Sequence, residues 1–275
     1  MTLTTPYPSL DTLIDLVGQA GQRMAEIGAS EGAAGNISLY IGWPLAESQR
    51  FPKIETVPLP QAAPELAGHA FLVTGSGRRL REIRTDPEGN LGLLVVDPGG
   101  RTAQLHTSPC RLFGRLTSEF NSHLAVHLDQ VRRTGTNFQA LVHAQPVHLT
   151  YLSHNPAYQL PAYLNNHLYR WQPETIMALP EGVGIVPFAP PGSASLQADT
   201  VAAMRRHRLV IWARHGVMAR SDTSIKRACD AIEYAETAAH YEYLNLASRD
   251  PAGGLSVAEI LAICEAYQIE QTLFS

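Results

Sequence analysis

Two histidines stand at the ends of short apolar segments, where their side chains could hold a metal ion. His143 closes the segment FQALVHA (138–144), and His215 follows LVIWA (209–213). Neutral imidazole is a good zinc ligand, and two histidines with one further donor leave a coordination position open. A single strand histidine is ordinarily a hydrogen-bonded core residue, so the metal interpretation depends on what accompanies the pair.

A carboxylate and two glycine-rich turns could supply the rest of a reaction site. Glu119 is expected one turn into a helix over 117–133, with Thr117 or Ser118 as its cap. A carboxylate beside an open metal position can move a proton at a carbon next to a polarised carbonyl. Backbone N–H groups and hydroxyls at AAGN (33–36) and TGSG (74–77) can hold a phosphate. Together these groups indicate chemistry at a carbonyl carbon, whereas each alone is also explained as a turn or a surface residue.

The third metal ligand is left open by the sequence. The spacing His-x-His, natural at a strand end, would place a second histidine where Gln145 stands. The neutral amide oxygen of glutamine is a weaker donor to zinc than imidazole. His148, three residues further on, is the alternative third ligand if the turn brings its ring back to the site.

Composition excludes several classes of protein. The 275 residues are 45% hydrophobic and 17% charged with a formal net charge of −4, so we expect a globular chain without a nucleic-acid footprint. The densest basic stretch, SGRRLREIR (76–84), is interpreted as a solvated face, with an anion site as the alternative. Three widely spaced cysteines favour a reducing cytoplasm over a disulfide framework. We expect no signal peptide and no membrane span, since no stretch reaches 18 apolar residues.

Hydrophobic periodicity predicts one α/β domain over residues 1–275. Strands are expected over 37–41, 69–77, 91–97, 138–144 and 182–189, with a strand or hairpin over 208–220. Helices are expected over 10–27, 117–133, 155–169, 195–207, 221–248 and 256–267, with Ser9 and Ser256 as caps. The proline-rich residues 43–66 are interpreted as a long surface excursion. Because the connections are both hairpin-like and helical, a mixed or mainly antiparallel sheet with flanking helices is favoured over a parallel one.

A series of motifs in chain order resembles the class II aldolase and adducin family. The motifs are GNISLYI, FLVTGSGRRLREI, NLGLLVVD, TSEFNSH, ALVHAQ, PEGVGIVP and LVIWARHGV. The insertion at 43–66 and PEGVGIVP resemble the family's rhamnulose 1-phosphate branch more than its shorter fuculose branch. The resemblance implies a three-layer α/β/α domain around a mainly antiparallel sheet. It also implies a homotetramer with active sites at subunit interfaces.

Site residues carry over from the family by motif. Glu119 matches the catalytic carboxylate, and Glu174 matches a second carboxylate that reaches a neighbouring subunit's site. The metal ligands fall on His143, Gln145 and His215. The phosphate-binding residues fall on Asn36, Ser76, Gly77, Thr117 and Ser118. Two positions depart from the family pattern: Gln145 replaces a ligand histidine, and Ala33 replaces an asparagine beside the phosphate, which removes one donor.

The resemblance implies a metal-dependent aldolase, a carbon–carbon lyase of rhamnose catabolism. Its substrate would be a ketose 1-phosphate similar to rhamnulose 1-phosphate. The products would be dihydroxyacetone phosphate and L-lactaldehyde, formed through an enediolate that a divalent metal, Zn²⁺ in the first instance, stabilises. The expected partners are this sugar phosphate and further copies of the chain, with no nucleic acid and no membrane.

Two alternatives stay open. The first is another enzyme of the same family that acts on a sugar phosphate, an epimerase or a dehydratase. The second is a catalytically silent, adducin-like interaction module, which the loss of a histidine at Gln145 keeps open. The joint presence of two carboxylates and two histidines at family spacing argues against a silent module.

Overall fold

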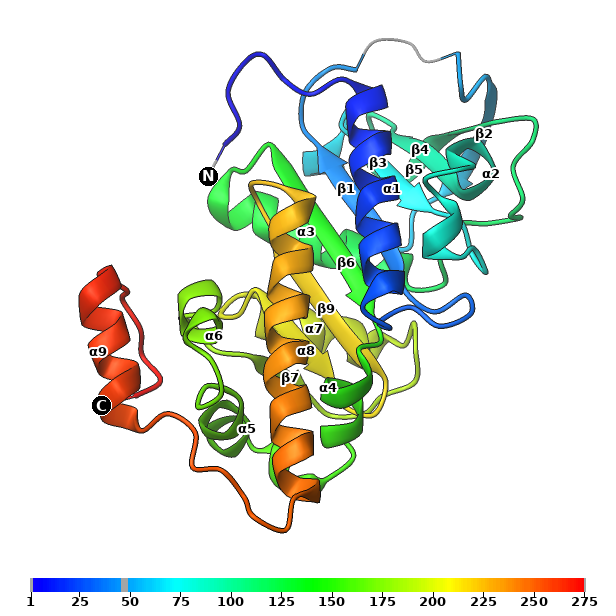
Figure 1. The fold of residues 1–275 in the computed structure, drawn as a ribbon. Helices are drawn as coiled ribbons and strands as arrows, with labels where there is room; N and C mark the ends of the chain where they lie inside the picture. Colours follow the sequence, from blue (N-terminus) through cyan, green and yellow to red (C-terminus); the bar gives the residue numbers. More distant parts are fainter. Residues whose placement is uncertain (1, 46–48, 275) are drawn as a thin grey trace.

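A computed structural model describes residues 2–45 and 49–274, and a continuous nine-stranded sheet runs through this described part (Figure 1). The strand order is β2-β5-β4-β3-β1-β6-β9-β8-β7, and β7 with β8 is its parallel pair. The strands are β1 (Asn36–Ile41), β2 (Lys53–Pro58), β3 (Ala70–Thr74), β4 (Leu91–Val96), β5 (Thr102–Thr107), β6 (Phe138–Ala144), β7 (Gly184–Val186), β8 (Leu209–Trp212) and β9 (Gly216–Ser221). The predicted mainly antiparallel sheet is confirmed.

Helices connect and cover the strands. They are α1 (Leu10–Glu26), α2 (Pro87–Asn90), α3 (Phe120–Thr134), α4 (Val147–Leu152), α5 (Pro161–Leu168), α6 (Pro173–Ala178), α7 (Ala194–Met204), α8 (Ile225–Ala247) and α9 (Val257–Tyr267), with short 3₁₀ turns η1 (Pro64–Leu66), η2 (Leu80–Glu82) and η3 (Pro156–Gln159). Ser9 and Ser256 accept hydrogen bonds from backbone N–H groups of the first turns of α1 and α9, as predicted. Within the described ranges, no helix combines the length and the apolar character needed to cross a bilayer.

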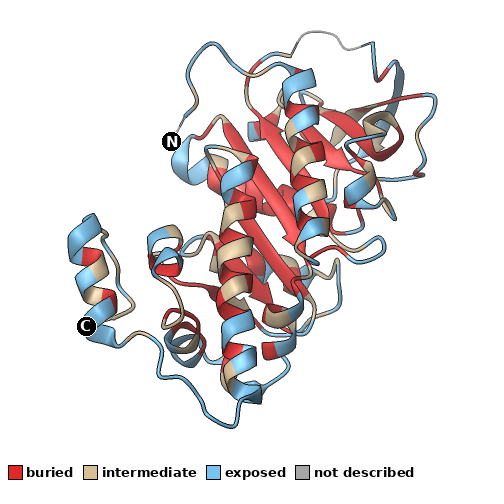
Figure 2. Cartoon of the chain, viewed as in Figure 1, coloured by how far each residue is buried: buried red, intermediate tan, exposed pale blue. Residues whose placement is uncertain are grey.

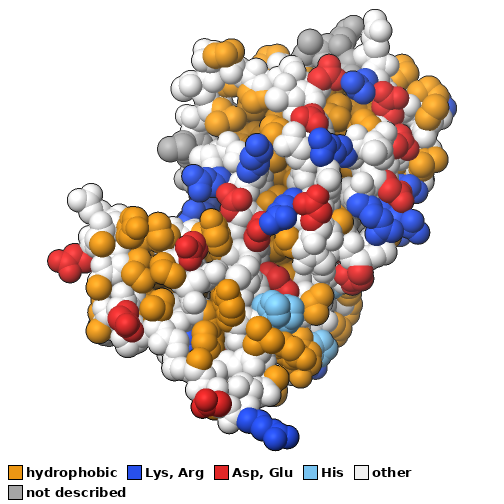
Figure 3. Space-filling model, viewed as in Figure 1, with side chains coloured by type: hydrophobic (Ala, Val, Ile, Leu, Met, Phe, Trp, Pro, Cys, Tyr) orange, Lys and Arg blue, Asp and Glu red, His pale blue; other side chains and the backbone are white. Residues whose placement is uncertain are grey.

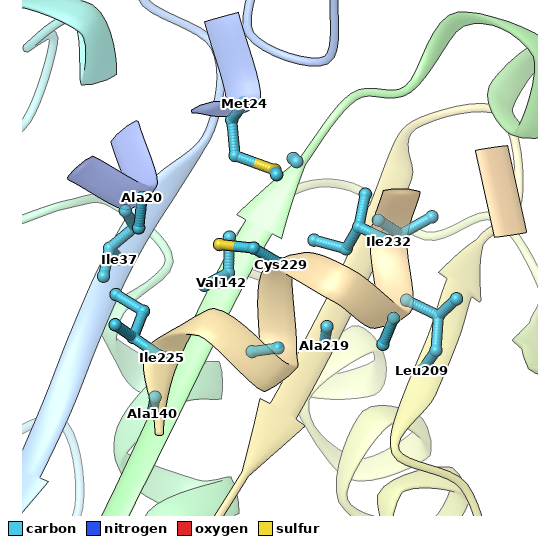
Figure 4. Packing of buried hydrophobic residues seen from close by; sticks show 14 of the residues in the cluster. Ala20, Met24, Ile37, Ala140, Val142, Leu209, Ala219, Ile225, Cys229 and Ile232 are labelled. Atoms are coloured by element: carbon cyan, nitrogen blue, oxygen red, sulfur yellow. The ribbon is translucent and has the colours of Figure 1, made fainter. Parts of the chain in front are cut away.

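The sheet is the middle of three layers. Successive side chains of a strand point to opposite faces, and helices pack against the side chains on each face. On one face, Ile37 and Val142 pack under α1 and α8, where Met24 and Cys229 meet them (Figure 4). On the other face, Tyr40 and residues of β3 and β4 pack against α3. A third cluster joins α3 to α7 over β8 and β9. The strands between these helices are buried on both faces (Figure 2).

The segment 43–66 is not only a surface excursion, as the sequence suggested. It contains β2, which pairs with β5 at the edge of the sheet, and its residues Phe51 and Leu66 are buried. Its strand was missed because β2 is exposed along most of its length and ends at Pro58. Proline lacks the N–H that a central strand needs but is tolerated on an edge strand.

The register of the central strands gathers the candidate site at one end of these strands. Asn36 at the start of β1 lies opposite His143 near the end of β6, and His143 lies opposite Met218 of β9. Because these strands are antiparallel, the start of β1, the end of β3, the end of β6 and the start of β9 lie at the same end of the strands. The loops at this end carry the residues of the candidate site.

Candidate metal centre and active site

A polar cleft with a volume of about 180 Å³ lies at this end of the central strands. It is lined by both predicted histidine ligands, by Glu119 and by Gln145. All of the predicted phosphate-binding residues also line it, namely Asn36, Ser76, Gly77, Thr117 and Ser118. The structure thus brings together residues from five separate segments that were assigned to one site from the sequence.

Glu119, His143 and His215 form a group that could hold a metal ion. Their ligand atoms all lie within 4.8 Å of one another. His143 Nε2 is 3.5 Å from Glu119 Oε2, and His215 Nε2 is 3.6 Å from Glu119 Oε1. His143 and Glu119 are buried, and His215 is half-buried. Histidine nitrogens and a carboxylate are a donor set that suits zinc and similar divalent metals.

The protonation of these groups fits a cation among them. His143 Nδ1 lies 2.8 Å from the carbonyl oxygen of Val217, which can only accept, so Nδ1 donates and a neutral ring presents its lone pair at Nε2. Burial, and secondarily the neighbouring His143, lowers the pKa of His215 to about 4, so this imidazole is neutral at pH 7. Glu119 Oε1 is buried without a hydrogen-bond partner. Lone pairs that converge in this way repel one another unless a cation lies between them.

The sequence suggested that Glu119 lies one turn into a helix, but the structure places it at the start of α3. It is the N-cap residue, and the backbone before it is held to the end of β3 by the hydrogen bond from Thr117 N to Thr74 O. Neither Thr117 nor Ser118 caps the helix, because this pairing keeps both residues outside its first turn. The carboxylate is held by the amide of Asn36, whose Nδ2 donates to Glu119 Oε2 over 2.7 Å.

A tight turn between β8 and β9 places His215. Arg214 has a φ of 64°, in the left-handed region, and its N–H donates to the hydroxyl of Ser153. At Gly216, a Cβ atom would lie 2.4 Å from the carbonyl oxygen of Ala144 and 3.1 Å from Cε1 of His143. Only glycine therefore allows the start of β9 to approach the end of β6, and this approach brings the two histidines together.

The two alternatives for the third ligand are placed differently. Gln145 lines the cleft beside His143 and Gly216. His148 lies on α4, where its Nδ1 is 2.7 Å from a carboxylate oxygen of Glu236 and its ring stacks on His240. It does not line the cleft. The placement favours Gln145 over His148 at the third position.

Some lining residues had not been identified from the sequence. Arg78 lines the cleft next to Gly77, with its guanidinium bound to Asn90, Glu82 and the carbonyl of Leu112. The sequence signal for Arg78 was the basic stretch SGRRLREIR (76–84). This stretch was interpreted as a solvated face, with an anion site as the alternative. Pro191, from the loop after β7, also lines the cleft, and no sequence signal pointed to it.

Ala33 and Glu174 lie in different places relative to the cleft. Ala33 lines the cleft and offers no side-chain donor there. Glu174 lies exposed on α6 and does not line the cleft of its own chain. A role for Glu174 therefore requires a second copy of the chain.

Comparison with known proteins gives consistent matches along the chain. A family model described as the class II aldolase and adducin N-terminal domain matches residues 15–243. The chain is 29% identical to the rhamnulose-1-phosphate aldolase of Yersinia pestis (strain Pestoides F) over 245 residues, 88% of each chain. A crystal structure of a sugar-phosphate aldolase from Thermotoga maritima matches with a TM-score of 0.71 and 27% identity, over 87% of this chain and 97% of that one. An L-fuculose 1-phosphate aldolase shares the fold, with a TM-score of 0.58 and 20% identity over 96% of this chain and all of that one.

Proposed function

Because this chain belongs to the class II aldolase and adducin family, we propose that it is a metal-dependent aldolase that cleaves a ketose 1-phosphate. The observation that carries the proposal is the convergence of His143, His215 and Glu119 in the cleft that also contains the phosphate-binding candidates. The substrate we propose is similar to rhamnulose 1-phosphate, with dihydroxyacetone phosphate and L-lactaldehyde as products. The name of the Yersinia relative supports this choice of sugar.

His143 and His215 would hold the divalent metal, with Gln145 as the third donor and zinc as the metal we propose. When bound, the metal supplies positive charge that polarises the ketose carbonyl. Glu119 would carry the proton at the carbon that becomes part of dihydroxyacetone phosphate. Its position suits this role, because the carboxylate lies beside both imidazoles and keeps one oxygen without a partner.

The phosphate would be held by further residues that line the same cleft. Asn36, Thr117 and Ser118 line it from the start of β1 and from the residues before α3. Ser76 and Gly77 line it from the turn after β3, where Gly77 has a φ of 70° and leaves its backbone open to a ligand. Backbone N–H groups in such a turn and at a helix N-terminus favour an anion.

The direct test is cleavage by purified, metal-loaded protein. We expect dihydroxyacetone phosphate to be released from rhamnulose 1-phosphate faster than from fuculose 1-phosphate, measured by coupled reduction with NADH. Release from neither sugar would contradict the aldolase proposal. An epimerised sugar phosphate in the NMR spectrum without release would favour the epimerase alternative instead. Absence of both turnover and metal binding would favour the interaction module.

The substitution Gln145→His is expected to raise the affinity for zinc, because imidazole is a stronger zinc donor than a neutral amide. Titration of zinc against a competing chelator measures the difference. His148→Ala is the matched control, and we expect it to leave the affinity unchanged, since His148 is bound to Glu236 outside the cleft. Loss of zinc binding in His148→Ala, with no gain in Gln145→His, would show that the third ligand has been assigned to the wrong residue.

We also propose that the protein assembles into a homo-oligomer, with a tetramer as the expected form. Large hydrophobic side chains are exposed along the C-terminal half of α8 and on α4, among them Leu246 at 56% and Tyr151 at 58% (Figure 3). Exposed apolar patches of this kind mark interaction surfaces. Assembly would also bring the exposed Glu174 to a neighbour's cleft.

Complementation tests the shared site. Glu119→Gln and Glu174→Gln proteins should each be poorly active, but subunit exchange between them should restore a measurable fraction of activity. A restored site would take Glu119 from one chain and Glu174 from its neighbour. A protein that is monomeric by light scattering and fully active after Glu174→Gln would contradict the shared site.

A reducing cytoplasm is part of the same proposal. Cys110, Cys229 and Cys264 are free thiols, and the last two are buried. Burial raises the pKa of the Cys229 thiol to about 12, so it stays protonated and unreactive. These thiols suit a compartment that keeps cysteines reduced.

A further inference from the structure

Two histidines that the proposed mechanism does not use lie buried on the inner face of α3. His123 and His127 are both 0% exposed, and neither lines the cleft. The hydroxyl oxygen of Ser38, on β1, lies between them, 2.7 Å from His123 Nδ1 and 2.7 Å from His127 Nε2. The same helix contributes the apolar residues Phe120, Leu124 and Leu128 to the core, and Gln130 is another of its buried polar residues.

This pair is connected to Glu119. His123 Nε2 lies 2.6 Å from Oδ1 of Asn36, and Nδ2 of Asn36 lies 2.7 Å from Oε2 of Glu119. A continuous chain of short hydrogen bonds therefore leads from His127 through Ser38, His123 and Asn36 to the carboxylate. All of these residues are buried.

The direction of the chain follows from its last member. An ionised Glu119 only accepts, so the NH₂ group of Asn36 must face it and the amide oxygen must face His123. His123 then donates from Nε2 and presents a lone pair at Nδ1, to which the Ser38 hydroxyl donates. The Ser38 oxygen in turn accepts from Nε2–H of His127. Every bond of the chain is satisfied when both histidines are neutral and carry their proton on Nε2.

Burial keeps both rings neutral. It lowers the pKa of His123 well below its ordinary value, with further contributions from His127 and His143. It lowers the pKa of His127 to about 3, against a smaller opposite effect of Gln139. The donor pattern of the chain is therefore constant across neutral pH, which suits a fixed support for a reacting group.

We propose that His123 is a positioning residue of the reaction, which holds the amide of Asn36 in the orientation that donates to Glu119. This inference rests on the proposed function of Glu119. Without His123, the Asn36 oxygen loses its buried donor and the amide is free to turn. A turned amide would direct its oxygen at the carboxylate and displace it from the reacting carbon. Ser38 and His127 act one step further back, by deciding which ring nitrogen of His123 carries the proton.

The experiment compares His123→Leu with His123→Gln in the metal-loaded enzyme. Leucine fills the space without a donor, so kcat should fall roughly 10–100-fold, the usual cost of losing an outer-shell partner, with metal content unchanged. Glutamine offers an amide donor near the position of Nε2 and should recover most of kcat. Gln130→Leu is the control, because Gln130 is a buried, hydrogen-bonded residue of the same helix with no link to Glu119. It should lower the melting temperature but leave kcat unchanged.

A second readout does not depend on turnover. Spectra of ¹⁵N-labelled histidine should show His123 and His127 as neutral Nε2–H tautomers throughout pH 6–8. A proton on Nδ1 of His123, or a His123→Leu enzyme with wild-type kcat, would overturn the positioning role. A fall in kcat that Gln130→Leu reproduces would also overturn it, as a structural effect. A wild-type protein that cleaves no ketose 1-phosphate would instead overturn the proposed function. The tautomers of His123 and His127 would still report whether the series of hydrogen bonds donates toward Glu119.

Discussion

Glu119→Gln is expected to lower kcat by roughly 10²–10⁴-fold, the usual contribution of a general acid–base group. Glutamine keeps the shape of the side chain and can still accept the hydrogen bond from Asn36 through its amide oxygen. It cannot take up a proton at the reacting carbon. Initial rates of dihydroxyacetone phosphate release, measured with the melting temperature and metal content of the same preparation, separate loss of chemistry from loss of fold.

The metal content of this variant also decides between two roles for the carboxylate. If Glu119 moves the proton, Glu119→Gln should retain its metal, whereas a variant that loses metal would identify Glu119 as a ligand. Glu236→Gln is a matched control, since Glu236 is another buried carboxylate beside a histidine, and it lies outside the cleft. It should weaken the anchoring of α4 without changing kcat. Wild-type rates in Glu119→Gln would show that another residue carries the proton.

Local sequence patterns predicted most of the fold because its central strands are short, apolar and bounded by turns. The segments that became β1, β3, β4 and β6 are almost wholly buried, so apolar runs or apolar alternation identified them. The family resemblance and the three-layer arrangement are confirmed. Strand β2 was missed because an edge strand exposed to solvent keeps neither apolar composition nor strict alternation.

The candidate site was predictable to the extent that its residues follow strand ends. Asn36, His143 and His215 stand next to strands whose register the antiparallel pairing fixes, so motif and position agreed. The place of Glu119 was not predictable in detail, since the hydrogen bond between Thr117 and Thr74 that delays the helix joins segments far apart in sequence. His123 left no local signal, because its partners come from β1 and a buried polar residue on a helix resembles an exposed one in sequence.

The metal ion is the electrophile of the proposed reaction, and His143 is one of its expected ligands. Loss of His143 Nε2 should abolish metal binding, a larger effect than the roughly 10–100-fold that an outer-shell partner costs. His143→Ala tests this, but it also removes the donor to the Val217 carbonyl and leaves a cavity beside Trp212. An unpaired buried carbonyl costs about 1–3 kcal/mol, so a loss of fold could imitate a loss of ligand.

His143→Asn separates the two effects. The asparagine amide lies near the position of Nδ1 and can still donate to Val217, while no nitrogen occupies the position of Nε2. We expect this variant to keep a melting temperature close to wild type and yet to contain no metal when purified without chelator and analysed by mass spectrometry. His148→Ala, which removes a histidine outside the cleft, should keep the full metal content. If His143→Asn folds and binds zinc as tightly as the wild type, His143 is not a ligand, and the metal centre at the end of β6 has been assigned to the wrong residues.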